Sequence, residues 1–371
     1  MASIRVAGRF LAGAALVLGV CVFMPTQARA QDANENKILL LQAKPMAYTI
    51  VRAAGQSENP RERLAALEAA QYAPDAAFEL ARRGLGDENP AVRFGALVTI
   101  GKLKLTRLGD AAIDLTRDEN ESVRGAALFA AKQCGKDVDL SPLGGMLANG
   151  SSGTRANAAM LIGQLGDPQA VGMLRAMAAK PMPRVSAAKR SSVRLQFAEA
   201  MIRLDPDDDE VLGSIRASVY SNLSDVRVLA IQILGEVGDR SVQGGLSHII
   251  DRENPIQVKI AAAQSLVRMG DRRASKVLLD ATRYDEDQLR KDLTDYVRNN
   301  PVGGPEALEI RDLLADEKGR ARMAAEVRAQ AAVALGYVGT EASAKRLASL
   351  LEDSEPIVRV AAASAILRAL R

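Results

Sequence analysis

The residues best suited to chemistry are three alternating aspartates, Asp205, Asp207 and Asp209. Acidic side chains at alternate positions are typical of the first half of a calcium-binding loop. Such a loop needs glycine at its sixth position and a bidentate acid at its twelfth, where this chain has Glu210 and Arg216. Acidic residues also stabilise the first turn of a helix through its dipole. The run therefore predicts the start of a helix rather than a metal site.

Other groups that catalysis uses are scarce in this chain. It has one histidine, His248, and two cysteines, Cys21 and Cys134. Cys134 ends a helical pattern, and we expect it to be a buried apolar residue rather than an intermolecular link. The sequence has no glycine-rich phosphate loop, paired-cysteine metal motif or nucleophile elbow. We therefore expect no catalytic residue, metal or cofactor, and we interpret His248 as a surface or packing residue.

The first 30 residues have the pattern of a secretory signal. Arg5 and Arg9 precede an apolar stretch from Phe10 to Met24, and Ala28-Arg29-Ala30 is a small-x-small cleavage site. We expect cleavage after Ala30 and a periplasmic or secreted product. Removal of this segment lowers the formal net charge from +4 to +1, so net charge does not draw the remaining chain to polyanions.

Two alternatives to cleavage stay open. The segment could be retained as a membrane anchor, although its fifteen apolar residues fall short of the roughly 20 that a span needs. It could also carry a lipoprotein site at Leu18-Gly19-Val20-Cys21, although Val20 is larger than the residue expected before the cysteine.

After this segment the chain repeats itself about every 31 residues. The stretch Asp87–Arg93 returns as Asp118–Arg124 and again as Asp353–Arg359. Most neighbouring copies of its basic residue lie 31 to 33 positions apart, with two longer gaps of 39 and 69. A period of this size predicts stacked supersecondary units, about ten of them. We call the recurring basic residues the signature residues; they are Arg93, Arg124, Arg155, Arg194, Arg227, Lys259, Arg328 and Arg359, with a weaker match at Arg63.

Each clear unit is predicted to contain two helices. In one example, apolar residues recur at helical spacing from Pro255 to Met269, Gly270 ends the helix, and a second helix follows from Arg273 to Thr282. Asn-Pro pairs at residues 59–60 and 89–90 suit the cap and first turn of a helix. The predicted fold is an all-α solenoid over residues 58–371. A segment over residues 31–57, with a capping helix from Asn36 to Ala53, precedes it.

The signature residues lie in a pattern with small and apolar positions, as in Thr154–Gly163 and Val327–Gly336. This pattern resembles the HEAT repeat, in its short bacterial form related to phycobilisome lyase HEAT-like repeats, from about Pro60 to Arg371. The resemblance implies that the signature residues pair with acids of adjoining repeats and are structural. A tetratricopeptide array is disfavoured, because the period is nearer 31 than 34 and the chain has no tryptophan.

The resemblance suggests enzymes as alternatives, but it does not supply their residues. Related deoxyhypusine hydroxylases hold iron with repeated His-Glu pairs, which this chain lacks, and no residues of a bilin-binding groove are identifiable. Nucleic-acid binding, a second alternative, would need a basic stripe or stacking aromatics, and aromatics are 3% of residues. We therefore expect an exported, non-enzymatic scaffold that binds a protein or peptide through the solenoid surface, with its second helices as the favoured face.

Breaks in the repeat are where contacts with a partner are expected. The first break is a basic, proline-bearing stretch with Arg184, Lys189 and Arg190. The second runs from residue 284 to 304 and contributes Tyr284 and Tyr296. A solvated connection and a degenerate helix are the respective structural alternatives.

The C-terminus is a third break, because the chain stops within or just after a first helix. Solenoid ends usually need a polar cap. Ile366, Leu367 and Leu370 are therefore expected at an open edge that favours self-association.

Overall fold

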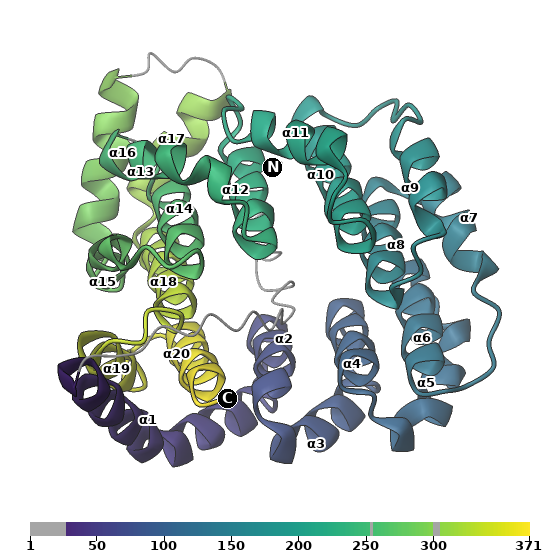
Figure 1. Ribbon diagram of the computed structural model, residues 1–371, viewed down its shortest axis with the longest axis horizontal. Helices are drawn as coiled ribbons and strands as arrows, with labels where there is room; N and C mark the ends of the chain where they lie inside the picture. The colour runs from purple at the N-terminus through teal and green to yellow at the C-terminus, as the bar shows by residue number, and fades with distance from the viewer. Residues whose placement is uncertain (1–26, 253–254, 300–304) are drawn as a thin grey trace. The chain divides into compact units, whose positions relative to one another are not determined.

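The structure is a computed structural model that describes residues 27–252, 255–299 and 305–371. These ranges form helices α1 to α20 with short 3-10 turns, and they contain no strand (Figure 1). The predicted all-α solenoid is confirmed. The chain divides into two compact units. We call Arg52–Val237 the middle unit, and the residues up to Val51 together with Gly238–Arg371 the terminal unit.

Helices of the middle unit alternate between two layers. The first helices of successive repeats pack on one another in chain order; they are α2 (Pro60–Ala69), α4 (Pro90–Leu103), α6 (Glu121–Gln133), α8 (Ser152–Leu165), α10 (Ala187–Leu204) and α12 (Ser224–Val237). The second helices pack against them; they are α3 (Pro74–Gly84), α5 (Gly109–Asp114), α7 (Ser141–Asn149), α9 (Ala170–Ala178) and α11 (Asp209–Ser218). Figure 1 shows the first helices along the inside of a curve and the second helices along its outside. The inner face of this unit is therefore formed by the first helices.

The terminal unit is built around α14 and α18, which pack on each other. Its helices are α13 (Gln243–Arg252), α14 (Ile256–Arg268), α15 (Ser275–Ala281), α16 (Glu286–Asn299), α17 (Pro305–Ala315), α18 (Glu317–Leu335), α19 (Glu341–Leu350) and α20 (Pro356–Ala369). Both α18 and α19 pack on α20. Ile366 and Leu367 of α20 are 0% and 2% exposed, so they do not form the open apolar edge expected at the C-terminus.

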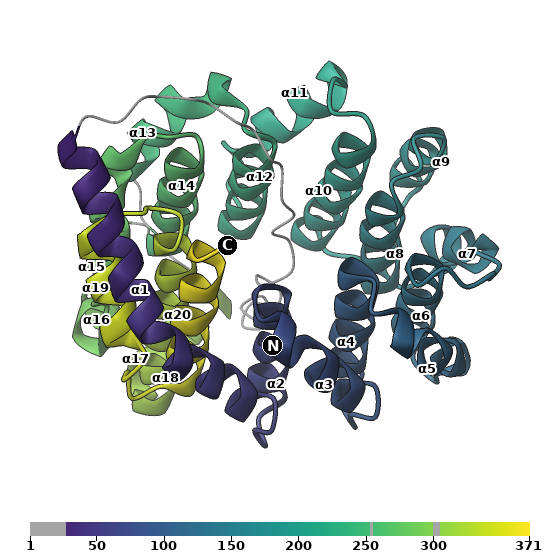
Figure 2. The same cartoon turned by 60° about the horizontal axis from the view of Figure 1, so that its bottom comes forward.

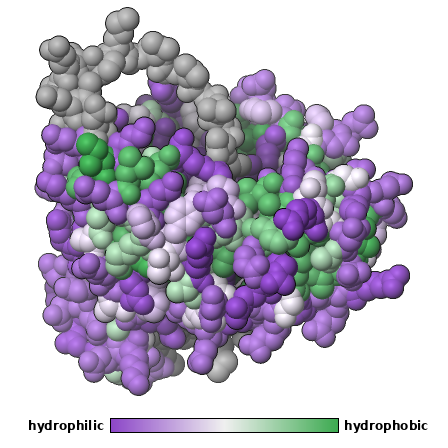
Figure 3. All heavy atoms as spheres, turned by 90° about the horizontal axis from the view of Figure 1, so that it is seen from below, coloured by the Kyte–Doolittle hydropathy of each residue, from purple (hydrophilic) through white to green (hydrophobic). Residues whose placement is uncertain are grey.

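The N-terminal helix α1 (Gln27–Ala54) is longer than the predicted capping helix, and most of it belongs to the terminal unit. It runs beside α19 in Figures 1 and 2, and Glu35 lies within electrostatic range of Lys345 on α19. Its buried side includes Leu40 and Ala47, while Ile38 on its outer side is 54% exposed. Most of the surface in Figure 3 is hydrophilic, with apolar residues in smaller groups.

Several predicted features of the N-terminal segment lie outside the described residues. Arg5, Arg9 and the apolar stretch from Phe10 to Met24 are among them, whereas Ala28-Arg29-Ala30 falls within α1. In the part of the chain that the structure describes, no helix is both long enough and apolar enough to cross a membrane.

Local sequence accounts for where the helices begin and end. The side chains of Asn59, Asn89 and Asn120 accept hydrogen bonds from backbone N–H groups two residues on, at 3.0, 2.9 and 3.0 Å. These bonds satisfy donors that the first turn of a helix leaves free. Gly166 and Gly270 follow helices with φ of 79° and 96°, the left-handed conformation that favours glycine at the end of a helix. Both kinds of boundary signal are confirmed.

Small residues set the distance between neighbouring first helices. A Cβ atom at Gly163 on α8 would lie 2.9 Å from the Cα atom of Ala200 on α10. A backbone atom cannot move away as the end of a flexible side chain can, so this contact requires glycine. Alanines such as Ala159 and Ala198 line the same helices and are almost fully buried. The two helices therefore pack backbone against backbone, which brings successive repeats into close contact.

Gly163→Ala is expected to lower the free energy of unfolding by about 1–3 kcal/mol, because the added methyl group overpacks the contact with Ala200. The matched control is Gly172→Ala on α9, where a Cβ atom would meet no atom within 4 Å. This control should raise stability by about 0.5–1 kcal/mol, since alanine has the higher helix propensity. Thermal unfolding of both variants measures the two signs. A stabilising effect at Gly163 would contradict the close approach.

Candidate functional site

Three arginines link one repeat to the next through paired hydrogen bonds. In each case Nε and Nη2 of the arginine donate to both carboxylate oxygens of an aspartate 24 or 25 residues later, at 2.7 to 3.1 Å. Two-pronged contacts between guanidinium and carboxylate groups are among the strongest that side chains make. The pairs are Arg63–Asp87, Arg93–Asp118 and Arg328–Asp353.

Arg93 shows how this link works. Its Nη1 donates to the backbone oxygens of Asp87 and Glu88, at 2.9 and 3.1 Å, which leaves Nε and Nη2 directed at Asp118. Desolvation pushes the pKa of Asp118 up, but hydrogen bonds from Arg93 and from the backbone N–H of Asn120 outweigh it, so the pKa lies below its ordinary value. The carboxylate therefore stays ionised and paired.

Arg124 and Arg155 are signature residues that make hydrogen bonds to backbone oxygens and pair with no acid in the described residues. Within the described ranges, Arg124 makes hydrogen bonds only to the backbone oxygens of Asp118 and Glu119, at 2.9 and 3.1 Å. The residues that match Asp118–Asn120 in the next repeat, Asn149–Ser151, include no acid. Arg155 donates instead to the backbone oxygen of Met177 at 2.6 Å, and burial lowers its pKa.

The remaining signature residues differ from one another. Arg227 donates from Nε to the backbone oxygen of Val219 at 2.9 Å. Arg359 lies in the last first helix and holds two backbone oxygens of its own loop, at 2.7 and 2.9 Å. Arg194 is exposed and Lys259 is half-buried. The same position in the repeat thus makes an ion pair in some repeats and only backbone hydrogen bonds in others.

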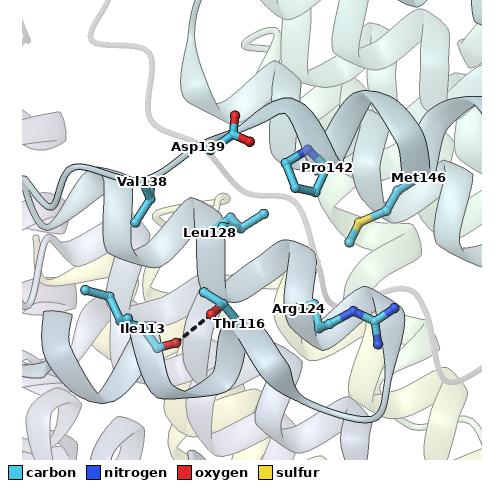
Figure 4. Close-up of a pocket in the computed structure, with 8 residues that line it drawn as sticks. All are labelled: Ile113, Thr116, Arg124, Leu128, Val138, Asp139, Pro142 and Met146. Atoms are coloured by element: carbon cyan, nitrogen blue, oxygen red, sulfur yellow. Dashed lines mark hydrogen bonds between the residues drawn. The ribbon is translucent and has the colours of Figure 1, made fainter.

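An open pocket of about 430 Å³ lies next to Arg124 (Figure 4). It is formed by α5, the 3-10 turn after it, α6, and the loop and helix α7 that follow. Arg124 and Asp139 lie at different edges of the pocket, and Figure 4 shows apolar side chains between them. The lining residues are Ile113, Thr116, Arg124, Leu128, Val138, Asp139, Pro142 and Met146.

The structure places the basic residues of the first break at the start of α10. Arg184 is exposed in the preceding loop, with φ of 63°. Lys189 and Arg190 are half-buried in the first turn of α10, where the Ser186 hydroxyl caps the backbone N–H of Lys189 at 3.3 Å. Arg190 donates to the backbone oxygen of Val185. Of the three candidate partner contacts, Arg184 is therefore the most accessible.

The acidic run serves helix α11. Asp208 caps the backbone N–H of Val211 at 3.1 Å, and the helix begins at Asp209, as the sequence predicted. Arg175 on α9 bridges Asp208 and Glu210. Among the described residues, no group of three or more histidine, cysteine, aspartate or glutamate side chains is placed to hold a metal ion.

The two tyrosines of the second break differ in exposure. Tyr284 is 5% exposed, its hydroxyl donates to Asp292 at 2.6 Å, and its backbone oxygen accepts from Arg328. Tyr296 lies half-buried on α16. Residues 300–304, the end of this break, lie outside the described residues.

Cys134 and His248, the cysteine and the histidine of the described residues, belong to different units. Cys134 is 8% exposed, and burial raises the pKa of its thiol, as suits the buried residue that we expected. His248 lies on α13 of the terminal unit, whereas Cys134 belongs to the middle unit.

A second set of polar residues emerges only from the structure. The residue nine positions after each signature residue is half-buried and polar or aromatic in nine of the repeats. We call this set the inner row. In the middle unit it comprises Tyr72, Lys102, Gln133, Gln164, Arg203 and Glu236, and in the terminal unit Arg268, Tyr337 and Arg368.

Charges of the inner row interact across the middle unit. Lys102 on α4 is within electrostatic range of Arg203 and Glu199 on α10 and of Glu236 on α12. Arg203 pairs with Glu199 at 3.0 Å and approaches Glu236 at 3.8 Å. Helices three and four repeats apart can share these interactions only if the side chains face a common space inside the curve.

Glu68 on α2 adds an unusual carboxyl group to this face. One of its oxygens, Oε2, is buried without a hydrogen-bond partner in the described residues. Desolvation raises the pKa of Glu68 to about 8, although Lys102 opposes the shift. Burial also disfavours the charged form of Lys102 and so lowers its pKa. The inner face of the middle unit is therefore a polar surface with restricted access to water.

The inner row has a recognisable signal in the sequence. Its members stand at a constant offset from the signature residues, at or within three residues of the end of each first helix. A polar side chain there interrupts an otherwise apolar pattern in one repeat after another. The offset could have identified the row, but not which of its members meet across the curve.

Comparison with known proteins places the repeats in a family. Residues 49–132 and 215–295 match the model of HEAT repeats, and residues 327–353 match that of the PBS lyase HEAT-like repeat. No curated protein matches the chain. A similar solved structure is the complex of CpcE and CpcF of phycocyanin lyase from Nostoc sp. PCC7120, at 17% identity over 64% of this chain and 93% of that chain, with a TM-score of 0.37. Another is human deoxyhypusine hydroxylase in complex with glycerol, at 14% identity over 90% and 97%, with a TM-score of 0.34.

Replacement of Arg93 and of Arg124 should have unequal effects. Arg93→Met leaves the carboxylate of Asp118 buried without its partner, and we expect a loss of about 2–3 kcal/mol in the free energy of unfolding. Arg124→Met removes only hydrogen bonds to backbone oxygens and should cost about 1 kcal/mol. Denaturant unfolding of the two variants side by side tests this. Equal losses would show that the ion pair between repeats contributes nothing beyond the contacts with the loop.

Proposed function

Because this chain is a HEAT-repeat protein, we propose that it is an exported scaffold that binds a protein or peptide on the inner face of its middle unit. HEAT repeats provide an extended surface, and such surfaces carry function through recognition. The observation that carries the proposal is the inner row, in which polar side chains occupy a position of the first helices that successive repeats keep free of apolar residues.

The charges of this face favour a partner that carries both signs. Lys102 and Arg203 are basic, whereas Glu199 and Glu236 are acidic, and these side chains interact with one another across the unit. Arg203, Glu199 and Glu236 retain 21% to 26% side-chain exposure, so they remain accessible while being held by neighbours. Preorganised charges of this kind give specificity more than affinity. An extended peptide segment with interspersed acidic and basic residues is the complementary ligand.

Export is the second part of the proposal, and it rests on the N-terminal sequence. Arg5, Arg9 and the apolar stretch from Phe10 to Met24 support recognition as a secretory signal. Cleavage after Ala30 would remove the first four residues of α1 and leave its buried positions, Leu40 and Val51 among them, in the product. The mature protein would therefore keep the part of the helix that packs.

Expression of the whole chain in a Gram-negative host tests export. The protein is expected in the periplasmic fraction, with a mass that corresponds to a chain starting at Gln31. The control variant Ala30→Glu replaces the small residue at the cleavage site and should retain the first 30 residues. Full-length protein confined to the cytoplasm would contradict the proposal.

Capture experiments with the mature chain test the binding face. Immobilised protein should enrich a partner from periplasmic extract, and Arg203→Glu should abolish this enrichment, because it places a third acidic group beside Glu199 and Glu236. The matched control is Arg83→Glu, which makes the same charge change at an exposed position of α3 in the same unit. The proposal fails if both variants recover the same proteins as the wild type, or if an unrelated solenoid does so.

A further inference from the structure

At the pocket beside Arg124, a signature arginine that has no acid partner among the described residues borders an apolar cavity. We propose that this pocket binds a monocarboxylate with an aliphatic group, with the guanidinium of Arg124 holding the carboxylate and the apolar wall holding the aliphatic group. This is a small-ligand site, separate from the recognition of a protein on the inner face.

Arg124 is held in the position that its counterparts use to bind a carboxylate. Its Nη1 donates to the backbone oxygens of Asp118 and Glu119, as Nη1 of Arg93 does to those of Asp87 and Glu88. In Arg93 the same anchoring leaves Nε and Nη2 to bind Asp118 at 2.8 and 3.0 Å. Arg124 thus has a fixed guanidinium group whose carboxylate must come from elsewhere.

Nearby acids do not take this place. The carboxylate of Asp118 is within electrostatic range of Arg124, but both of its oxygens are held by Arg93. Asp139, at another edge of the pocket, accepts hydrogen bonds from the backbone N–H and the hydroxyl of Ser141, at 2.9 and 2.6 Å. Nε and Nη2 of Arg124 therefore make no hydrogen bond to the described residues and can donate to the carboxylate of a ligand.

The rest of the pocket selects the body of the ligand. Ile113, Leu128, Val138, Pro142 and Met146 supply an apolar wall, and a volume of about 430 Å³ is within the range of sites for small molecules. The hydroxyl of Thr116 donates to the backbone oxygen of Ile113 at 2.8 Å, so it is already engaged (Figure 4). Burial of an aliphatic group against this wall contributes about 25 cal/mol per Å² of apolar surface.

Asp139 limits the ligand to a single negative charge. Hydrogen bonds from Ser141 lower the pKa of its carboxyl group, which therefore stays ionised at neutral pH. A second carboxylate on the ligand would lie in the apolar part of the pocket or approach Asp139, and both placements are unfavourable. A dicarboxylate is consequently expected to bind more weakly than a monocarboxylate of equal length.

Two natural sources share the proposed chemistry, and titration calorimetry of the mature chain separates them. Octanoate represents a free fatty acid, and N-acetyl-leucine represents the C-terminus of a peptide that ends in an aliphatic residue. The uncharged controls are methyl octanoate and N-acetyl-leucinamide. We expect at least one of the carboxylates to bind in a one-to-one ratio, at least about tenfold more tightly than its uncharged control, because a charge-assisted hydrogen-bond pair is lost in the latter.

Variants of the pocket connect this binding to the site. Arg124→Met should weaken binding of the carboxylate at least about tenfold, whereas Arg83→Met, at an exposed arginine of the same unit, should leave it unchanged. Val138→Phe fills the apolar wall from the loop before α7 without altering Arg124, and it should also weaken binding. Melting curves confirm that each variant is folded.

The proposal is overturned if neither carboxylate binds at millimolar concentration, if the uncharged controls bind equally well, or if both pocket variants retain wild-type affinity. Capture of a partner on the inner face would survive that result, because none of its residues lines the pocket. Octanoate binding without N-acetyl-leucine binding identifies a lipid-derived ligand, and the reverse identifies a peptide terminus; either outcome supports an aliphatic carboxylate site.

Discussion

The structure depends on contact between neighbouring repeats, because no helix pair in it could be stable alone. Helix α5 has 6 residues and α2 has 10, and isolated helices of such length are marginal in water. Stability comes instead from packing a first helix on its neighbours, at distances that positions such as Gly163 make short. The link from Arg93 to Asp118 ties the loop of one repeat to that of the next, and so it supports the same stacking. In such an array each repeat stabilises mainly its neighbours.

The same constraint explains why polar groups are free to serve recognition at particular positions. A residue between two stacked helices must be small or apolar, but the inner row lies at the edge of the stack, where side chains reach past the neighbouring repeat. The role of each signature residue likewise depends on its neighbours. The next repeat supplies an aspartate to Arg93, so the guanidinium of Arg93 is structural. The next repeat supplies no acid to Arg124, whose guanidinium is anchored in the same way and is proposed to bind an external carboxylate.

Much of the fold was predictable because its signals are local. Asparagine caps and C-terminal glycines act within a few residues, so the helix boundaries at Asn89 and Gly270 could be predicted from sequence. Surface roles were harder to assign. Lys189 and Arg190 belong to a basic break in the repeat but lie in the first turn of α10, and Tyr284 is buried and donates a hydrogen bond to Asp292. Whether a side chain at a break in the pattern faces solvent depends on packing between distant helices, which sequence spacing does not report.

The inner face of the middle unit illustrates how burial changes the chemistry of a charged surface. Desolvation raises the pKa of Glu68 and lowers the pKa of Lys102. In both cases it favours the neutral form of the side chain. With a pKa of about 8, Glu68 is mainly a protonated acid at neutral pH, able to donate a hydrogen bond rather than to attract a cation. Hydrogen bonds in such a poorly hydrated environment are stronger than at an open surface, and an unmatched polar group is correspondingly costly. A partner must therefore match these groups one by one, and this requirement makes the inner face a selective surface rather than a general attractor of charge.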